Sequence, residues 1–319
     1  MRVRLTIALS LAAQTAAGDI PLAVPVDCTL GESCYIQQTV DHDPTAGASD
    51  FTCGSLTYDG HKGTDFALPS LAAMAEGVDV IAAAPGTVRG ARDGMADILQ
   101  TGDNAPDVAG RECGNGVVIS HGDGWETQYC HLAQGSIAVR TGDRVATGTL
   151  LGQIGLSGET QFPHVHLSVR QDGAVIDPFD PDGAITCGAP SDDTLWQDTL
   201  PVPAGGFIAA GFADGVPDYA DIKAGTAGSD ILQTSAPIVV WGYVFGGRTG
   251  DEMQLTITGP AEDVIDQTVV LERNQAQLFR ASGRRAPTGG WDAGDYAGTI
   301  TLIRDGVTLD RIETTVSVR

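Results

Sequence analysis

The sequence has 319 residues, with 18 Lys and Arg against 41 Asp and Glu, so its formal net charge at pH 7 is -23. A nucleic-acid-binding protein needs a basic face to displace phosphate counterions. No cluster of Lys and Arg is present, which excludes nucleic acid as a partner. The length predicts two domains, and 42 Gly with short runs of Thr, Val and Ile predict a mainly β chain.

Residues 1–17 have the pattern of a signal peptide. Arg2 and Arg4 form a short positive region, and Leu5–Ala13 is an apolar run of the length found in secretory signals. Small residues before Gly18 offer a cleavage point, and the run is too short to cross about 30 Å of hydrocarbon. We therefore expect an exported protein without stable membrane insertion, located in the periplasm, in the cell envelope or outside the cell.

Six cysteines fit that compartment, because an even number in an exported chain predicts disulfides. We predict a local loop, a link across a hairpin and a link between the two ends of one domain: Cys28–Cys34, Cys113–Cys130 and Cys53–Cys187. A cysteine-rich zinc site is not expected, because no Cys-x-x-Cys spacing is present. The cysteines therefore define a first domain over residues 18–187.

The first part of this domain, Gly18–Asp59, has an irregular pattern, and His42 within it is flanked by two Asp residues. Such a histidine could be a metal ligand, but we expect a solvated loop. His61 and Asp65 follow, at a spacing that would place both on one face of a helix. The glycines around them disfavour a helix, so we predict a turn leading into a strand, with both side chains brought to one point.

Two short strands are expected within Val78–Val88, around a Pro-Gly turn. The polar, Gly-rich stretch Arg89–Arg111 is predicted to be a surface insertion, of a length that often walls a groove. Gly116–His121 and Trp125–His131 form a hairpin pattern around a Gly-Asp-Gly turn. Short strands folding back on each other are expected in Val139–Ile154.

Alternation along these strands predicts which side chains share a face. Tyr129 and His131 are expected to point one way from the second hairpin strand, and His164 and His166 to share a face of a later strand. His121, which borders the hairpin turn, is expected to be structural. The nearby Gly-Leu-Ser-Gly loop lacks the spacing of a nucleophile elbow.

Residues 188–206 are rich in Pro, Gly, Asp and Ser, which predicts a linker. Residues 207–319 are predicted to form a β-sandwich-like domain, because alternating strand patterns recur between Gly-containing turns. The expected strands are Pro237–Phe245, Met253–Thr258, Val264–Glu272, Ala276–Arg280, Tyr296–Arg304 and Val307–Val318. This region contains no His, so we assign it no chemistry and leave its role unknown.

Four of the six histidines and one aspartate lie in three short motifs of the first domain. Gly-His-x-Gly-x-Asp begins at Gly60, Tyr-x-His-Leu at Tyr129 and Pro-His-x-His-Leu at Pro163. Imidazole is the commonest zinc ligand, a carboxylate is an accepted third ligand, and three protein ligands with one open position describe a catalytic zinc site. The order of these motifs, continued to about Pro178, resembles the M23 zinc metallopeptidases of the LytM and lysostaphin type.

This resemblance implies an antiparallel β-sheet core with an open groove and one Zn²⁺ per chain, bound by His61, Asp65 and His166. It implies that His131 and His164 are the catalytic histidines and that peptidoglycan peptide stems are the substrate. No His-Glu-x-x-His motif supplies a glutamate base, but an imidazole can accept a proton or donate to an oxyanion near neutral pH.

The sequence therefore predicts an exported zinc metalloendopeptidase that hydrolyses the peptide cross-links of bacterial peptidoglycan. The main alternative is a non-catalytic M23-like protein that binds the cell wall or activates an amidase. A phosphocarrier or lipoyl-like domain would also show Gly-punctuated hairpins, but the export signal and Asp65 argue against it. Protein partners stay unknown.

Overall fold

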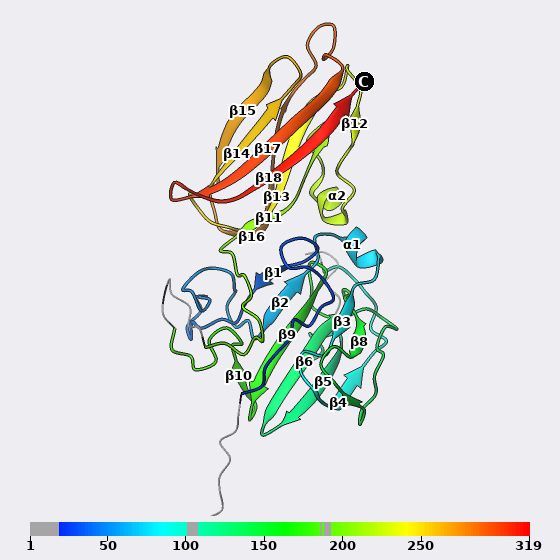
Figure 1. Ribbon diagram of the computed structural model, residues 1–319, viewed down its shortest axis with the longest axis vertical. Helices are drawn as coiled ribbons and strands as arrows, with labels where there is room; N and C mark the ends of the chain where they lie inside the picture. The colour runs from blue at the N-terminus through cyan, green and yellow to red at the C-terminus, as the bar shows by residue number, and fades with distance from the viewer. Residues whose placement is uncertain (1–18, 101–107, 186, 188–192) are drawn as a thin grey trace, which may run out of the picture.

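The computed structural model describes residues 19–100, 108–185, 187 and 193–319. Within these residues the chain forms two β-rich halves stacked along the long axis of the molecule (Figure 1). The described helices are short, α1 at Leu71–Ala75 and α2 at Tyr219–Ala224, and neither is long or apolar enough to cross a bilayer. The mainly β, antiparallel fold class is confirmed. The predicted signal peptide lies outside the described residues.

The N-terminal half contains an eight-stranded sheet in the order β1-β2-β9-β6-β5-β4-β7, with β10 paired to β9. Its pairs are all antiparallel. The strands are β1 Tyr35–Gln38, β2 Thr64–Ala67, β4 Gly86–Arg92, β5 Asn115–Gly122, β6 Trp125–Leu132, β7 Arg144–Val145, β9 His164–Gln171 and β10 Ala174–Ile176. A second, small sheet pairs β3 Asp79–Ile81 with β8 Leu150–Gln153.

Strand β9 separates the core from the candidate site by simple alternation. Val165, Leu167 and Val169 are almost fully buried in the hydrophobic cluster of this half. His164 and His166 point from the opposite face, as the period of two predicts. Burying each of the large apolar side chains stabilises the fold by about 1.5–3 kcal/mol, so the strand register is strongly specified.

Several sequence expectations for this half are corrected. The strands expected around the Pro-Gly turn exist, but β3 pairs with β8 and β4 with β5 and β7, because the turn carries the chain from one sheet to the other. Strands β7 and β8 do not fold back on each other either, because they belong to different sheets: β7 pairs with β4 and β8 with β3. The expected insertion begins later than Arg89, since Arg89–Arg92 continue β4, and its residues 101–107 lie outside the described part.

Three elements of this half were not expected from the sequence: β1, β10 and α1. All four residues of β1 are buried, so this strand shows no alternation that a sequence could reveal. Helix α1 has only five residues, and it begins where the Ser70 hydroxyl accepts a hydrogen bond from the Ala73 backbone N–H.

The C-terminal half consists of a three-stranded sheet, β11-β13-β16, and a five-stranded sheet, β12-β18-β17-β14-β15. The strands are β11 Gly206–Ala213, β12 Ile231–Leu232, β13 Ile238–Gly247, β14 Glu252–Thr258, β15 Asp263–Val270, β16 Gln275–Arg284, β17 Gly294–Arg304 and β18 Val307–Val318. One apolar cluster contains side chains of both sheets, including Val240, Leu255 and Ile300. The six predicted strands are confirmed, whereas β11, β12 and α2 were not expected.

The two halves share an apolar contact. Tyr35 of β1 packs on Phe245 of β13 with ring centroids 4.9 Å apart, and both rings belong to one buried cluster with Leu56. The expected linker is not free of the fold either, because Leu195 and Trp196 are buried in the core of the N-terminal half. The predicted domain boundaries stay a prediction.

All three predicted disulfides are confirmed: Cys28–Cys34, Cys53–Cys187 and Cys113–Cys130. The segment around His42 is a loop, as expected, but the His42 side chain itself is not solvated. Its Nε2 lies 2.8 Å from a carboxylate oxygen of Asp177, and only 13% of its side chain is exposed. The hydrogen bond to Asp177 raises the pKa of His42, and burial offsets only part of that rise.

The Cys53–Cys187 disulfide spans 134 residues, whereas Cys28–Cys34 spans 6. Replacing Cys53 and Cys187 by Ala should lower the free energy of unfolding by about 2–4 kcal/mol, because a long loop gains most chain entropy when it is freed. The double Ala variant of the short link should lose clearly less. Urea unfolding under non-reducing conditions measures the free energy of unfolding of both variants. Equal losses would contradict the larger contribution expected from Cys53–Cys187.

The His42–Asp177 pair should make stability depend on pH. A raised folded-state pKa means that the pair stabilises the fold fully below the unfolded pKa of about 6.5, and that this contribution is lost as the pH rises through the folded value. We expect His42→Gln to lower the free energy of unfolding by about 1–2 kcal/mol at about pH 5.5 and by less at about pH 9. A pH-independent difference in urea midpoints would refute this.

Candidate metal centre

Three of the predicted site residues come together through one strand pair and one turn. Asp65 of β2 is the register partner of His166 of β9, and His61 lies in the turn that precedes β2. The Asp65 Oδ1 atom lies 3.2 Å from His61 Nε2 and 2.8 Å from His166 Nδ1, and the two nitrogens are 3.1 Å apart. Antiparallel pairing therefore joins two donors that are far apart in the sequence.

A glycine makes this close approach possible. A Cβ atom at Gly63 would lie 2.6 Å from His166 Nε2, nearer than real side chains come. Gly60 has a positive φ of 77°, which L side chains rarely adopt, and it lets the turn bring His61 back over the strand. The predicted turn leading into a strand is confirmed.

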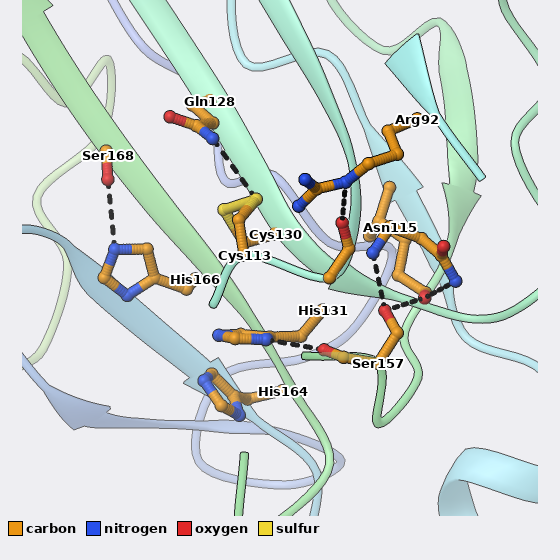
Figure 2. The surroundings of a disulfide bond; sticks show 12 residues. Arg92, Cys113, Asn115, Gln128, Cys130, His131, Ser157, His164, His166 and Ser168 are labelled. Carbon is orange, nitrogen blue, oxygen red and sulfur yellow. Dashed lines mark hydrogen bonds between the residues drawn. A yellow bond between two sulfur atoms is a disulfide. The ribbon is translucent and has the colours of Figure 1, made fainter. Parts of the chain in front are cut away.

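Further hydrogen bonds orient the two imidazoles. His61 Nδ1 donates to the Thr39 carbonyl oxygen at 2.6 Å, so its Nε2 carries the lone pair that faces the cluster. His166 Nε2 lies 3.0 Å from the Ser168 hydroxyl, which can accept its proton (Figure 2). In that tautomer the lone pair of His166 Nδ1 is free to bind a metal ion. Such outer partners fix the tautomers of metal-binding histidines in known sites.

The cluster fits a zinc ion by ligand type and by spacing. Two imidazoles and one carboxylate are an established catalytic zinc set, and donors about 2.0–2.1 Å from a tetrahedral zinc lie about 3.3 Å from one another. The three donor atoms here are separated by 2.8–3.2 Å. Within the described parts of the chain this is the one group of three such residues with donor atoms that close together.

The electrostatics of the cluster favour an ionised carboxylate. Burial alone would raise the pKa of Asp65, but the neighbouring imidazoles of His61, His164 and His166 favour its ionised form and hold that pKa well below its usual range. Burial would likewise lower the pKa of His61, yet the Asp65 carboxylate raises it on balance. A cation among these residues is therefore favoured.

The other two predicted residues, His131 and His164, lie beside the cluster with ring centroids 4.6 Å apart. His131 Nδ1 donates to the Ser157 carbonyl oxygen at 2.8 Å, and His164 Nδ1 to the Phe162 carbonyl oxygen at 2.9 Å. Because the carbonyls bind both Nδ1 protons, each neutral ring keeps its lone pair on Nε2. His164 Nε2 is 3.7 Å from the Asp65 carboxylate.

His131 has an unusual backbone that its neighbours hold in place. Its φ is 65°, a strained value for a residue other than glycine. The preceding Cys130 is tied to Cys113 by a disulfide, and the His131 N–H donates to the Cys113 carbonyl oxygen (Figure 2). The positive φ also breaks the expected alternation, so Tyr129 enters the core instead of sharing the face of His131.

Burial keeps both rings uncharged. It lowers the pKa of His131 well below its usual range, and the nearby imidazoles of His164 and His166 further disfavour a positive charge on this ring. Burial also lowers the pKa of His164, although the Asp65 carboxylate opposes that shift. Two buried, neutral imidazoles that face one cleft are suited to proton transfer near neutral pH.

The cluster opens into a cleft of about 610 Å³. His131, His164 and His166 line one side, and Tyr219, Lys223, Gln275 and Gln277 of the C-terminal half line another. The sequence reasoning missed these four residues because the region contains no histidine and no motif. Only the packing of the two halves brings them to the site.

The two remaining histidines lie outside the cluster. His42 pairs with Asp177, and His121 contacts the Pro85 carbonyl oxygen and the Thr127 hydroxyl at 2.8 Å each, in keeping with a structural role. Ser157 is fully buried, and its hydroxyl donates to the Leu132 carbonyl oxygen, so it offers no exposed nucleophile. The five predicted site residues are thus brought together, while their individual roles stay a prediction.

Comparison with known proteins gives relatives of the N-terminal half. Cell division protein DipM of Caulobacter vibrioides is 33% identical over 90 residues, 26% of this chain and 14% of that protein. DD-carboxypeptidase/endopeptidase Mpg of Neisseria meningitidis serogroup B is 31% identical over 120 residues, 37% of this chain and 22% of Mpg. Peptidoglycan DD-endopeptidase ShyA of Vibrio cholerae serotype O1 is 34% identical over 106 residues, 33% of this chain and 19% of ShyA.

The matched stretches are thus a small part of each relative, from 14% to 22% of its length. The sequence model of Peptidase family M23 matches residues 59–178, which include all five residues of the candidate site. Over residues 59–178 the chain is therefore similar to peptidase family M23.

Proposed function

We propose that this chain is an exported zinc metalloendopeptidase that hydrolyses the peptide cross-links of bacterial peptidoglycan. The observation that carries the proposal is the convergence of His61, Asp65 and His166 beside two neutral imidazoles that face the same cleft. The family assignment of residues 59–178 supports a peptidase. The names of two relatives, Mpg and ShyA, support peptidoglycan peptides as the substrate class.

His61, Asp65 and His166 would hold one Zn²⁺ at the cleft. A bound zinc ion supplies Lewis acidity, which polarises a scissile carbonyl and makes water nucleophilic at neutral pH. The buried Asp65 carboxylate carries the negative charge that holds the ion. The Thr39 carbonyl and the Ser168 hydroxyl keep the two ligand rings oriented.

His131 and His164 move the protons of the reaction. Each presents an unprotonated Nε2, which can accept a proton from the attacking water and later return it to the leaving amide nitrogen. The carbonyl oxygens of Ser157 and Phe162, bonded to the Nδ1 protons, stabilise the transient imidazolium. The ring that is protonated can also donate to the oxyanion that develops on the carbonyl.

The test of this function is digestion of purified peptidoglycan by the zinc-loaded full chain, followed by mass spectrometry. We expect cross-linked fragments to disappear and new stem-peptide ends to appear, and a chelator should abolish the change. A chain that binds the polymer but leaves every cross-link intact would support the non-catalytic alternative instead.

Two alanine variants should separate metal binding from proton transfer. His166→Ala removes a donor of the cluster and should lose bound zinc, as measured by elemental analysis of the purified protein. His131→Ala removes no donor and should keep zinc, yet lower kcat by about 100- to 10,000-fold, the usual contribution of a general acid or base. Equal zinc loss in both variants would contradict this division of roles.

The Cys113–Cys130 disulfide should matter for turnover more than for metal content. Replacing both cysteines by Ala frees the strained backbone of His131, so we expect a lower kcat with zinc still bound at one ion per chain. The matched control is the Cys28–Cys34 pair, which lies away from the cleft and should leave kcat unchanged when replaced. Unaltered turnover in the first variant would show that the disulfide does not position His131.

A further inference from the structure

We propose that Lys223 of helix α2 binds a carboxylate group of the peptide substrate at the wall of the metal cleft. The inference rests on the proposed function and adds a specificity-determining residue to it. It also gives the C-terminal half a role, as a wall of the substrate site.

The first support is the position of the side chain. Lys223 lines the cleft that contains His131, His164 and His166, although it is about 60 positions from the nearest of them in the sequence. Helices α1 and α2 face each other where the two halves meet (Figure 1). Beside Lys223 the wall continues with Gln277 and with Gln275, and the amide group of Gln275 is suited to bonding a peptide backbone.

The second support is that this wall is fixed relative to the metal centre. Gly225 ends α2 with a φ of 82°, and a Cβ atom there would lie 2.7 Å from the Ser70 hydroxyl at the start of α1. Only a glycine permits that approach, and it seats α2 on the N-terminal half. The side chain of Lys223 is therefore held near the cleft by close packing.

A chain of hydrogen bonds fixes the same wall from the other side. The Tyr243 hydroxyl donates to Gln277 Oε1 at 2.6 Å, and Gln277 Nε2 donates to the hydroxyl of Tyr35 at 3.1 Å and to Gln37 Oε1 at 3.0 Å. Tyr35 and Gln37 belong to β1, which pairs with the strand that carries Asp65. The bonds therefore connect the C-terminal sheet to a metal-ligand strand.

The third support is charge. The whole sequence contains two lysines, and Lys223 is the one Lys or Arg among the described residues that line the cleft. The anionic groups there are Asp65, which belongs to the metal cluster, and the exposed Glu159. A substrate carboxylate would be attracted to Lys223, the one Lys or Arg among the described residues of the cleft wall.

The ammonium group is also available to a ligand. Its Nζ atom lies 5.2 Å from the centroid of the Tyr219 ring, a cation–π contact that orients the side chain. Within the described part of the chain no carboxylate lies within ion-pairing distance of that nitrogen. The side chain therefore has a preferred position and free N–H donors.

The experiment measures binding, so it does not depend on turnover. The probes are a synthetic peptidoglycan stem peptide with a free C-terminal and a free side-chain carboxylate, and two copies in which one or the other is amidated. Zinc-loaded full chain carrying His131→Ala serves as the background, so that bound peptide is not cut. Isothermal titration calorimetry gives Kd for each peptide.

In that background Lys223→Gln should weaken binding of the parent peptide about tenfold, the effect of one lost charge-assisted hydrogen bond. The peptide whose amidation removes the recognised carboxylate should bind wild-type Lys223 and Lys223→Gln alike, which identifies the carboxylate. Lys223→Arg, which keeps the charge, should stay within about threefold of the parent. Arg311→Gln is the matched control, because it removes one charge from the exposed, distant strand β18 and should change nothing.

The proposal is overturned if Lys223→Gln weakens all three peptides equally, if Arg311→Gln has the same effect, or if the parent peptide does not bind. Failure of the proposed function has a different signature. In that case the chain would leave peptidoglycan intact while the dependence of peptide binding on Lys223 persisted.

Discussion

The pairing of β2 with β9 is the constraint on which the rest of the structure depends. Its register sets Asp65 opposite His166, two residues that are 101 positions apart. The same register places in the core the apolar residues of β9 that alternate with the histidines. A slip of one residue would turn His164 and His166 inward and expose Val165 and Leu167. The same hydrophobic burial that stabilises the sheet therefore also fixes the geometry of the candidate metal centre.

The C-terminal half completes the site that this pairing begins. Its sheets have their own core, but Phe245 near the end of β13 packs on Tyr35 of β1, and α2 is seated on α1. The cleft is consequently formed by both halves. Under the proposed function such an arrangement would separate two tasks, since the histidines of the first half would carry the chemistry while the second half could vary the groups that meet the substrate.

The sequence predicted features that depend on local pattern. Alternation located six strands of the C-terminal half and the shared face of His164 and His166, and redox context with spacing led to the three disulfides. Features set by tertiary packing were missed. The fully buried β1 shows no alternation, and β3 and β8 are too short for their sequences to indicate which strand they pair with. No sequence motif indicates that Lys223 lies at the cleft. The strained backbone of His131 is likewise invisible in the residue order.

If the chain is exported and hydrolytic as proposed, the link between Cys113 and Cys130 has a consequence for when it becomes active. Thiols stay reduced in the cytosol and are oxidised after export. A newly made chain would then carry His131 on a strand that the disulfide does not yet hold, and the disulfide would form only after export. Activity would therefore depend on the compartment, which would protect the cell that synthesises the protein.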